Sequence, residues 1–207
     1  MNPAAIRTKD IFRRIWDNAG MLVVFVMLFA ALSLTVPYFF SWQNMIGLAL
    51  SVSTVGIIAC TMLFCLASGD FDISVEAIVA FAGVLAAVVI NATGSVTTGI
   101  AAALLASGLA GAFNGVVIAK LGINALIATL ATLQIVRGLG FIVSNGSAVG
   151  IMEPSFFVFG NGNLLGIPTP IWITALSFAV FGFLLNRTTF GRNTLAIGGN
   201  REAARLA

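Results

Sequence analysis

The stretch MIGLALSVSTVGIIACTMLFCLA, residues 45–67, contains no charged side chain. A helix rises about 1.5 Å per residue, so about 20 apolar residues are needed to cross about 30 Å of hydrocarbon. This stretch is therefore long enough to span a membrane as one helix, and similar runs occur along the rest of the chain.

The composition favours a membrane protein over a soluble one. The chain has 207 residues, of which 59% are hydrophobic and 8% charged, whereas a soluble domain carries about 25% charged residues. The net charge of +3 is compatible with nucleic-acid binding, but the basic residues lie at the ends of apolar segments, where membrane topology explains them. We expect an all-α, polytopic membrane protein with a lipid bilayer as its surroundings and no nucleic-acid partner.

Six apolar runs define the expected transmembrane helices. They cover about residues 21–39, 45–67, 75–90, 97–119, 125–144 and 171–185. The third and sixth runs are short for a full span, so one of them is expected to be a half-span or to begin deeper in the membrane. We divide the chain into an amphipathic N-terminus (1–20), a transmembrane domain (21–185) and a polar C-terminal segment (186–207).

The distribution of basic residues predicts the orientation. With the N-terminus in the cytoplasm, nine of the ten basic residues lie inside, and the outer connections near 37–44, 91–96 and 145–170 contain none. This bias follows the positive-inside rule. The tenth basic residue, Arg137, lies within the fifth run, and six spans return the C-terminal segment to the cytoplasm.

Side chains for catalysis and metal binding are scarce. The chain has no histidine, which is the commonest general base and metal ligand. Cys60 and Cys65 lie five residues apart on one predicted helix and therefore on different sides of it, so we expect neither a disulfide nor a metal site. The sequence contains no G-x-x-x-x-G-K-[ST] motif, and we expect no catalytic residue and no bound nucleotide in this chain.

Three carboxylates lie close together in SGDFDISVE, residues 68–76. An aspartyl protease needs two aspartates on facing helices, which Asp70 and Asp72, two residues apart, do not provide. Two interpretations stay open. The carboxylates cap and solvate the start of the third span, with help from Ser74, or they mark a structural break near a transport path.

Other polar residues lie inside predicted spans. A charge there costs about 2.5–3.5 kcal/mol on insertion scales, so Arg137 is expected to face protein or water, or to extend toward the outer end. Gln134 and Ser144 lie nearly on the same helical face. Asn114, on the fourth span, is expected to join helices, while pairing of Arg137 with Asp70 or Asp72 is not expected.

The fourth span also carries small residues four apart: Ala103, Ser107, Gly111 and Gly115. A face without large side chains lets another helix approach closely. We therefore expect close helix packing along this face.

Four stretches resemble the permease subunits of ATP-binding-cassette sugar importers in bacteria, the branch that serves ribose, arabinose, xylose and galactose. They are residues 66–77, 111–139, 167–172 and 188–207. The last is the most specific, because the cytoplasmic loop of that family typically has a Gly-Arg start, a Gly-Gly-Asn turn and an acid-Ala-Ala helix. The corresponding residues are Gly191, Arg192, Gly198, Gly199, Asn200, Glu202, Ala203 and Ala204.

The resemblance implies a homodimeric permease in the bacterial inner membrane. An extracytoplasmic binding protein delivers a monosaccharide, with a pentose such as L-arabinose as the expected substrate, and separate ATPase subunits bind and hydrolyse ATP. Residues 186–207 are then the ATPase-coupling loop. Asn200 can cap the helix 201–207, and Arg201 and Arg205, four residues apart, give that helix a basic face.

The sequence departs from the usual pattern of this family in two ways. Members of the family are usually longer, with further spans after this loop, and more often have glycine at the position of Glu76. The alternatives are an ion-gradient-driven secondary transporter or channel that uses Asp70, Asp72 and Arg137, and a transport-inactive fragment of the permease.

Overall fold

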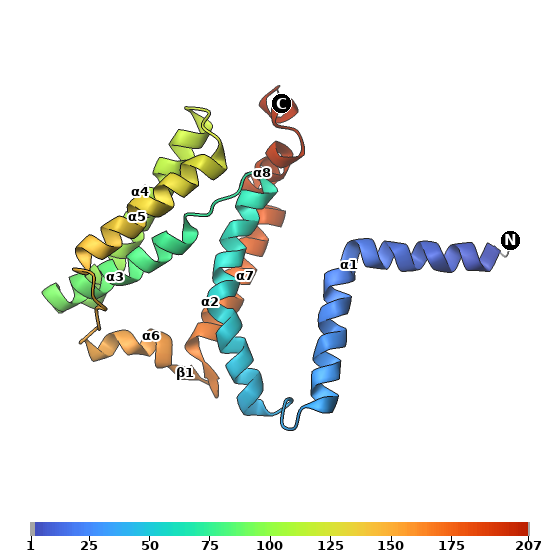
Figure 1. Cartoon of the computed structure of the whole chain (residues 1–207), viewed down its shortest axis with the longest axis horizontal. Helices are drawn as coiled ribbons and strands as arrows, with labels where there is room; N and C mark the ends of the chain where they lie inside the picture. Colours follow the sequence, from blue (N-terminus) through green and yellow to red (C-terminus); the bar gives the residue numbers. More distant parts are fainter. Residues whose placement is uncertain (1–2, 207) are drawn as a thin grey trace. The chain divides into compact units, whose positions relative to one another are not determined.

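A computed structural model describes the backbone of residues 3–206 and the side chains of residues 16, 19–158 and 160–206. Helices dominate the described part of the chain (Figure 1). In chain order the elements are α1 (Pro3–Thr35), α2 (Trp42–Ala67), α3 (Val75–Thr93), α4 (Val96–Ala119), α5 (Ala125–Val143), η1 (Pro154–Phe156), α6 (Phe157–Asn161), β1 (Asn163–Leu164), β2 (Ile167–Pro168), α7 (Thr169–Arg187), α8 (Thr189–Gly199) and α9 (Arg201–Leu206).

The all-α membrane architecture is confirmed. Five of the described helices, α2, α3, α4, α5 and α7, are long and apolar enough to cross a membrane, and the apolar part of α1, Ala19–Thr35, is shorter. The half-span expected for the third or sixth run is wrong. Both α3 and α7 have 19 residues, or about 28 Å at 1.5 Å per residue, because α3 extends to Thr93 and α7 begins at Thr169.

The chain divides within α2 into two units, Met1–Ala49 and Leu50–Ala207. In the first unit, α1 is interrupted at Ala19, whose φ of −141° and ψ of 17° are not helical. The apolar part of α1 ends at Thr35, four residues before the predicted end. Pro37 lies in the turn that follows, and the ring of Phe29 packs against Phe39 and Phe40 at centroid distances of 5.2 and 6.1 Å.

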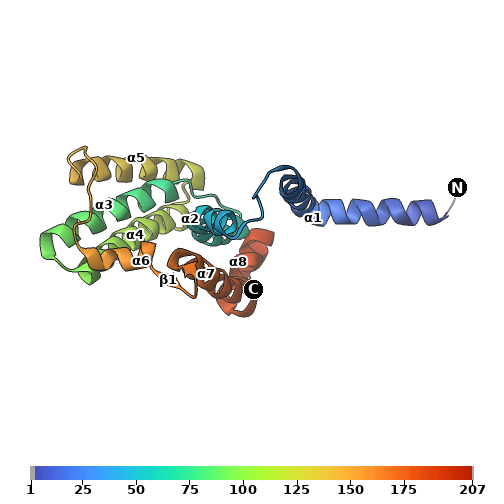
Figure 2. The same ribbon diagram turned by 90° about the horizontal axis from the view of Figure 1, so that it is seen from below.

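In the second unit, α3, α4 and α5 pack side by side (Figures 1 and 2). A close approach lies between Ile90, which is fully buried on α3, and Gly99 on α4. A Cβ at Gly99 would collide with the Ile90 side chain and the Ala86 carbonyl oxygen. Glycine at this position therefore permits the packing of α3 on α4.

The small-residue face of α4 is only partly used. Ala103 is buried, but a Cβ built on Gly111 or Gly115 meets no described atom within 4 Å. Within the described part of the chain, close packing on this face is therefore found at Ala103 and not at Gly111 or Gly115. The tight contact is made by Gly99, which lies on the preceding turn of the same helix.

A second packing group joins α2 to α7, which lie side by side in both ribbon views. The Thr174 hydroxyl donates to the Ser53 carbonyl at 3.1 Å, next to Gly56, which leaves room for the Thr174 methyl group. Phe64 on α2 packs against Phe181 on α7 and stacks on Phe190 on α8, at centroid distances of 5.8 and 5.6 Å. The C-terminal segment is therefore packed onto α2 as well as onto α7.

The connections of the second unit gather at two ends. The Asn91 side chain, near the end of α3, donates to the Gly150 carbonyl at 2.7 Å and accepts from the Met152 amide at 3.1 Å. The α2–α3 connection meets the C-terminal segment instead, through Asp70 and Arg201. This grouping agrees with the predicted topology, in which 91–96 and 145–170 share one side; which side is cytoplasmic stays a prediction.

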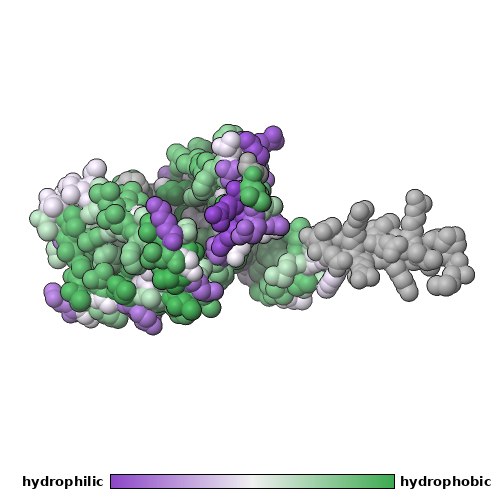
Figure 3. Space-filling view, turned by 90° about the horizontal axis from the view of Figure 1, so that it is seen from above, coloured by the Kyte–Doolittle hydropathy of each residue, from purple (hydrophilic) through white to green (hydrophobic). Residues whose placement is uncertain are grey.

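The exposed surface is also that of a membrane protein. Figure 3 shows hydrophobic residues over most of the visible face of the second unit and a hydrophilic cluster over its C-terminal segment. Large apolar side chains such as Leu104, Leu105 and Leu109 on α4 are about 70% exposed. In water such a surface would be costly, whereas lipid solvates it.

Candidate functional site

The C-terminal segment forms two short helices. We expected one helix from Arg201 onward, preceded by a Gly-Gly-Asn turn. In the structure Gly198 and Gly199 belong to the end of α8, because the Asn200 amide donates to the Ala196 carbonyl at 3.0 Å and continues the helix through both glycines. The turn is made by Asn200 alone, in extended conformation. Its side-chain oxygen accepts from the Ala203 amide at 3.0 Å and caps α9.

Two glycines fit this segment against the membrane helices. A Cβ at Gly191 would collide with the carbonyl oxygens of Leu184 and Leu185 at the end of α7, and one at Gly198 with the carbonyl oxygen of Ala67 at the end of α2. A Cβ at Gly199 meets nothing within 4 Å. Gly191 and Gly198 are thus close-approach positions, while Gly199 is not.

Most of the other coupling candidates point outward. Arg192, Gly199, Asn200, Arg201, Glu202, Ala203 and Arg205 are exposed, and Ala204 is half-buried. The segment therefore has a packed side, set by its glycines and Phe190, and a free side that carries its charges.

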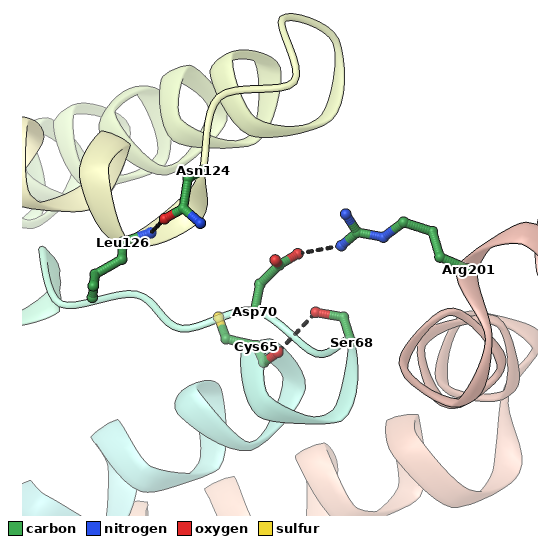
Figure 4. Close-up of polar contacts among 6 residues, drawn as sticks. All are labelled: Cys65, Ser68, Asp70, Asn124, Leu126 and Arg201. Atoms are coloured by element: carbon green, nitrogen blue, oxygen red, sulfur yellow. Dashed lines mark hydrogen bonds and ion pairs between the residues drawn. The ribbon is translucent and has the colours of Figure 1, made fainter.

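An ion pair connects this segment to the α2–α3 connection (Figure 4). The Arg201 guanidinium donates to Asp70 Oδ2 at 2.7 Å. The connection leaves α2 through Ser68, which donates to the Cys65 carbonyl, and Gly69, which has a φ of 84°. Asp70 and Arg201 are 131 residues apart in sequence, and no local pattern predicted that they meet.

Asp72 and Ser74 anchor the same connection to the helices. Asp72 Oδ1 accepts from the Ser74 amide at 2.8 Å and from the Ser74 hydroxyl at 2.6 Å. Asn114, which is 3% exposed, donates to the Ser74 hydroxyl at 3.0 Å and accepts from the Thr132 hydroxyl at 2.5 Å. Asn114 therefore joins α4 and α5 to the start of α3. One of the two open interpretations gives Ser74 a capping role, but its side chain makes no cap hydrogen bond to α3, because its hydroxyl is used in this network.

Arg137 on α5 pairs with Glu76 in the first turn of α3, at 3.2 Å. For Glu76 the sequence leaves two interpretations open, capping of the third span and a structural break near a transport path, and neither predicts that it pairs with Arg137. Asp70 and Asp72 bond instead to Arg201 and Ser74. Ser144 lines the same cavity as the pair, whereas Gln134 does not. Gln134 is exposed, and within the described residues it has no hydrogen-bond partner.

Groups that hold a metal ion are not found in the described part of the chain: no cluster of three His, Cys, Asp or Glu residues occurs there. Among the described residues, the charged groups form two separate ion pairs, one at the C-terminal segment and one between α3 and α5. This arrangement does not bring a nucleophile and a base together. Together with the apolar helices, these contacts describe a multi-pass membrane protein. It has polar groups within its helix bundle and a folded polar segment at one end.

Comparison with known proteins identifies the kind of membrane protein. Residues 44–207 match the family described as "Branched-chain amino acid transport system / permease component", and the chain belongs to this family. No solved structure matches. The family and the five apolar helices place the chain in the bacterial inner membrane as a multi-pass protein.

Several curated relatives are described as L-arabinose or ribose permeases. The chain is 62% identical over 203 residues to the L-arabinose transport system permease protein AraH of Escherichia coli K12, covering 98% of this chain and 62% of that protein. It is 56% identical to the L-arabinose ABC transporter permease protein AraH of Azospirillum brasilense, covering 99% and 60%. It is 34% identical to the ribose import permease protein RbsC of E. coli K12, covering 100% and 66%. The chain thus spans about three fifths of the length of the arabinose relatives.

Proposed function

We propose that this chain is the membrane permease component of an ATP-driven, binding-protein-dependent monosaccharide importer, with L-arabinose as the first substrate to test. The observation that carries the proposal is the 62% identity, over 98% of the chain, to an L-arabinose transport system permease. The lower identity of 34% to a ribose permease supports the sugar class and favours L-arabinose over ribose.

In the proposed mechanism, α8 and α9 are the attachment point for a separate ATPase subunit. Their exposed charges, among them Arg192, Glu202 and Arg205, are available for contact with a partner. ATP binds and is hydrolysed on the partner, and this chain holds no cofactor. Movement of the segment is passed to α2 through the tight contact at Gly198 and to the start of α3 through Arg201 and Asp70.

The membrane helices form the transport path together with a second copy of the permease. An extracytoplasmic sugar-binding protein delivers the sugar at the end formed by residues 91–96 and 145–170. Within the bundle, Asn114 holds helices together, and Arg137 lies in contact with the path. Gln134, which is exposed on α5, is available to line the path or to meet another helix.

The first experiment measures sugar uptake. The chain is expressed alone, and also extended past Ala207 with the C-terminal part of its L-arabinose relative, in cells without their own arabinose importer but with an ATPase and a binding protein. The proposal expects uptake of labelled L-arabinose that stops on ATP depletion and persists when the proton gradient is collapsed. The opposite dependence identifies an ion-coupled carrier, and uptake by the extended form alone identifies residues 1–207 as transport-inactive.

The second experiment tests the attachment point directly. The tagged chain and a version without residues 188–207 are each co-purified with the ATPase from detergent-solubilised membranes. The proposal expects the complete chain to retain the ATPase and the shortened chain to lose it. Equal retention by both would show that the ATPase attaches elsewhere.

A further inference from the structure

A cavity lies between α3 and α5 and extends to the chain that follows α5. Its volume is about 360 Å³, which falls within the range of about 300–1,000 Å³ typical of small-molecule sites. The walls are mainly apolar, from α3 (Ala77, Ala80, Phe81, Val84) and α5 (Val136, Gly140, Phe141). The size suits a small molecule.

The charged groups of the cavity are Glu76 and Arg137. Although they bond to each other, their side chains are 76% and 54% exposed. A guanidinium has five N–H donors and a carboxylate has two acceptor oxygens, and only one donor and one acceptor are used between them. Charges inside a membrane protein face protein or water and not lipid, so these free groups need polar partners.

The other end of the cavity is formed by the chain that follows α5. Ser144, Gly146, Ser147 and Ala148 line it there. This is the end at which Asn91 binds the Gly150 carbonyl, and it faces outward in the predicted orientation. A polar molecule that arrives from outside therefore meets this end first and the ion pair, about two helical turns deeper, second.

We propose that this cavity is a monosaccharide site on the import path. Arg137 donates to one sugar hydroxyl, Glu76 accepts from a neighbouring one, and the apolar face of the sugar ring lies against Phe81. The proposal rests on the proposed function, because it names where the substrate of that permease is held. No covalent step is involved. The charge-assisted hydrogen bonds fix the orientation of the sugar, and the small apolar cavity limits its size.

Two glycines on α5 supply a matched test of the cavity. Gly140 lines it, and a Cβ there meets only Phe81, at 3.9 Å; Gly138 does not line it, and a Cβ there meets nothing within 4 Å. In the extended permease with its ATPase and binding protein, Gly140→Leu should lower L-arabinose uptake about tenfold or more by filling the cavity, while Gly138→Leu should leave it within about twofold. Equal effects of the two variants would overturn the site.

A labelling experiment tests occupancy without relying on transport. Cys60 and Cys65 are replaced by alanine, and Ser144→Cys is introduced in the cavity or Thr97→Cys outside it, on the exposed start of α4. L-arabinose should slow the reaction of Ser144→Cys with a membrane-impermeant thiol reagent and leave Thr97→Cys unaffected, and mannitol at the same concentration should protect neither. Absence of protection at Ser144→Cys overturns the site.

The two proposals fail in distinguishable ways. If the unmodified extended permease imports L-arabinose but shows no protection and no difference between the glycine variants, this site is wrong and the proposed function stands. If the unmodified permease imports no sugar with its ATPase and binding protein present, the proposed function itself is wrong.

Arg137→Gln separates an effect on sugar binding from an effect on ATPase attachment. The variant should raise the KM for uptake about tenfold and should still retain the ATPase.

Discussion

At the scale of single residues, two adjacent glycines are predicted to differ sharply. Gly198→Ala places a methyl group against the Ala67 carbonyl oxygen, so α8 must shift away from α2. Forced contacts of this kind cost about 1–3 kcal/mol. Gly199→Ala meets nothing and should be neutral or slightly stabilising, since alanine favours a helix over glycine by about 0.5–1 kcal/mol. Thermal unfolding of the purified protein in detergent, followed by size-exclusion fluorescence, measures the difference. Equal midpoints would contradict the close contact.

The buried amide of Asn114 gives a second prediction at this scale. Asn114→Leu removes the hydrogen bonds to Ser74 and Thr132, which leaves the Thr132 hydroxyl without its acceptor and the Ser74 hydroxyl with Asp72 alone. We expect a loss of roughly 1–2 kcal/mol, the range for polar contacts between helices in membranes and for unsatisfied buried groups. Gln134→Leu is the matched control, because Gln134 is an exposed amide on α5. The same unfolding assay should show a lower midpoint for Asn114→Leu alone; a similar loss in both variants would argue against the network.

At the scale of elements, the ion pair between Asp70 and Arg201 connects the C-terminal helices to the start of α3. The pair is partly exposed, with side-chain exposures of 31% and 61%, so its contribution to stability is small, about 0–1 kcal/mol. We expect this ion pair to act mainly on the coupling between the membrane helices and ATP hydrolysis by the partner. Asp70→Asn and Arg201→Gln should each reduce sugar-stimulated ATP hydrolysis by the complex about threefold or more, and the double variant should be no worse than either single variant, since both break one interaction.

Two control variants accompany this comparison of the single and double variants. Lys120→Gln removes an exposed basic charge at the end of α4, and no carboxylate partner for Lys120 occurs in the described residues; it should leave ATP hydrolysis unchanged. The exchanged pair, Asp70→Arg with Arg201→Asp, should recover much of the coupling. Additive losses in the double variant would show that the two residues act independently.

The elements show how far the sequence could predict the structure. Hydrophobic length located α2, α4 and α5 closely, because lipid imposes a minimum on every spanning helix. The same criterion underestimated α3 and α7, whose ends carry polar residues such as Asn91 and Arg187 that remain helical. The side-chain contacts could not be predicted. Glu76 and Arg137 lie 61 residues apart, and which carboxylate reaches Arg137 depends on how the α2–α3 connection enters the bundle, which only the three-dimensional packing determines.

At the scale of the whole second unit, polar contacts join chain connections at each of two ends, so one label at each end determines the orientation of this part. Asn91 holds the chain after α5 at one end, and Arg201 holds the α2–α3 connection at the other. The excess of basic residues predicts that the Arg201 end is cytoplasmic. In a protein with Cys60 and Cys65 replaced by alanine, Thr93→Cys should react with an impermeant thiol reagent in intact cells. Asn193→Cys, which is equally exposed on α8, should react only after the cells are permeabilised. Labelling of Asn193→Cys in intact cells would place the C-terminal helices outside, out of reach of any cytoplasmic ATPase, and the proposed mechanism would then fail as a whole.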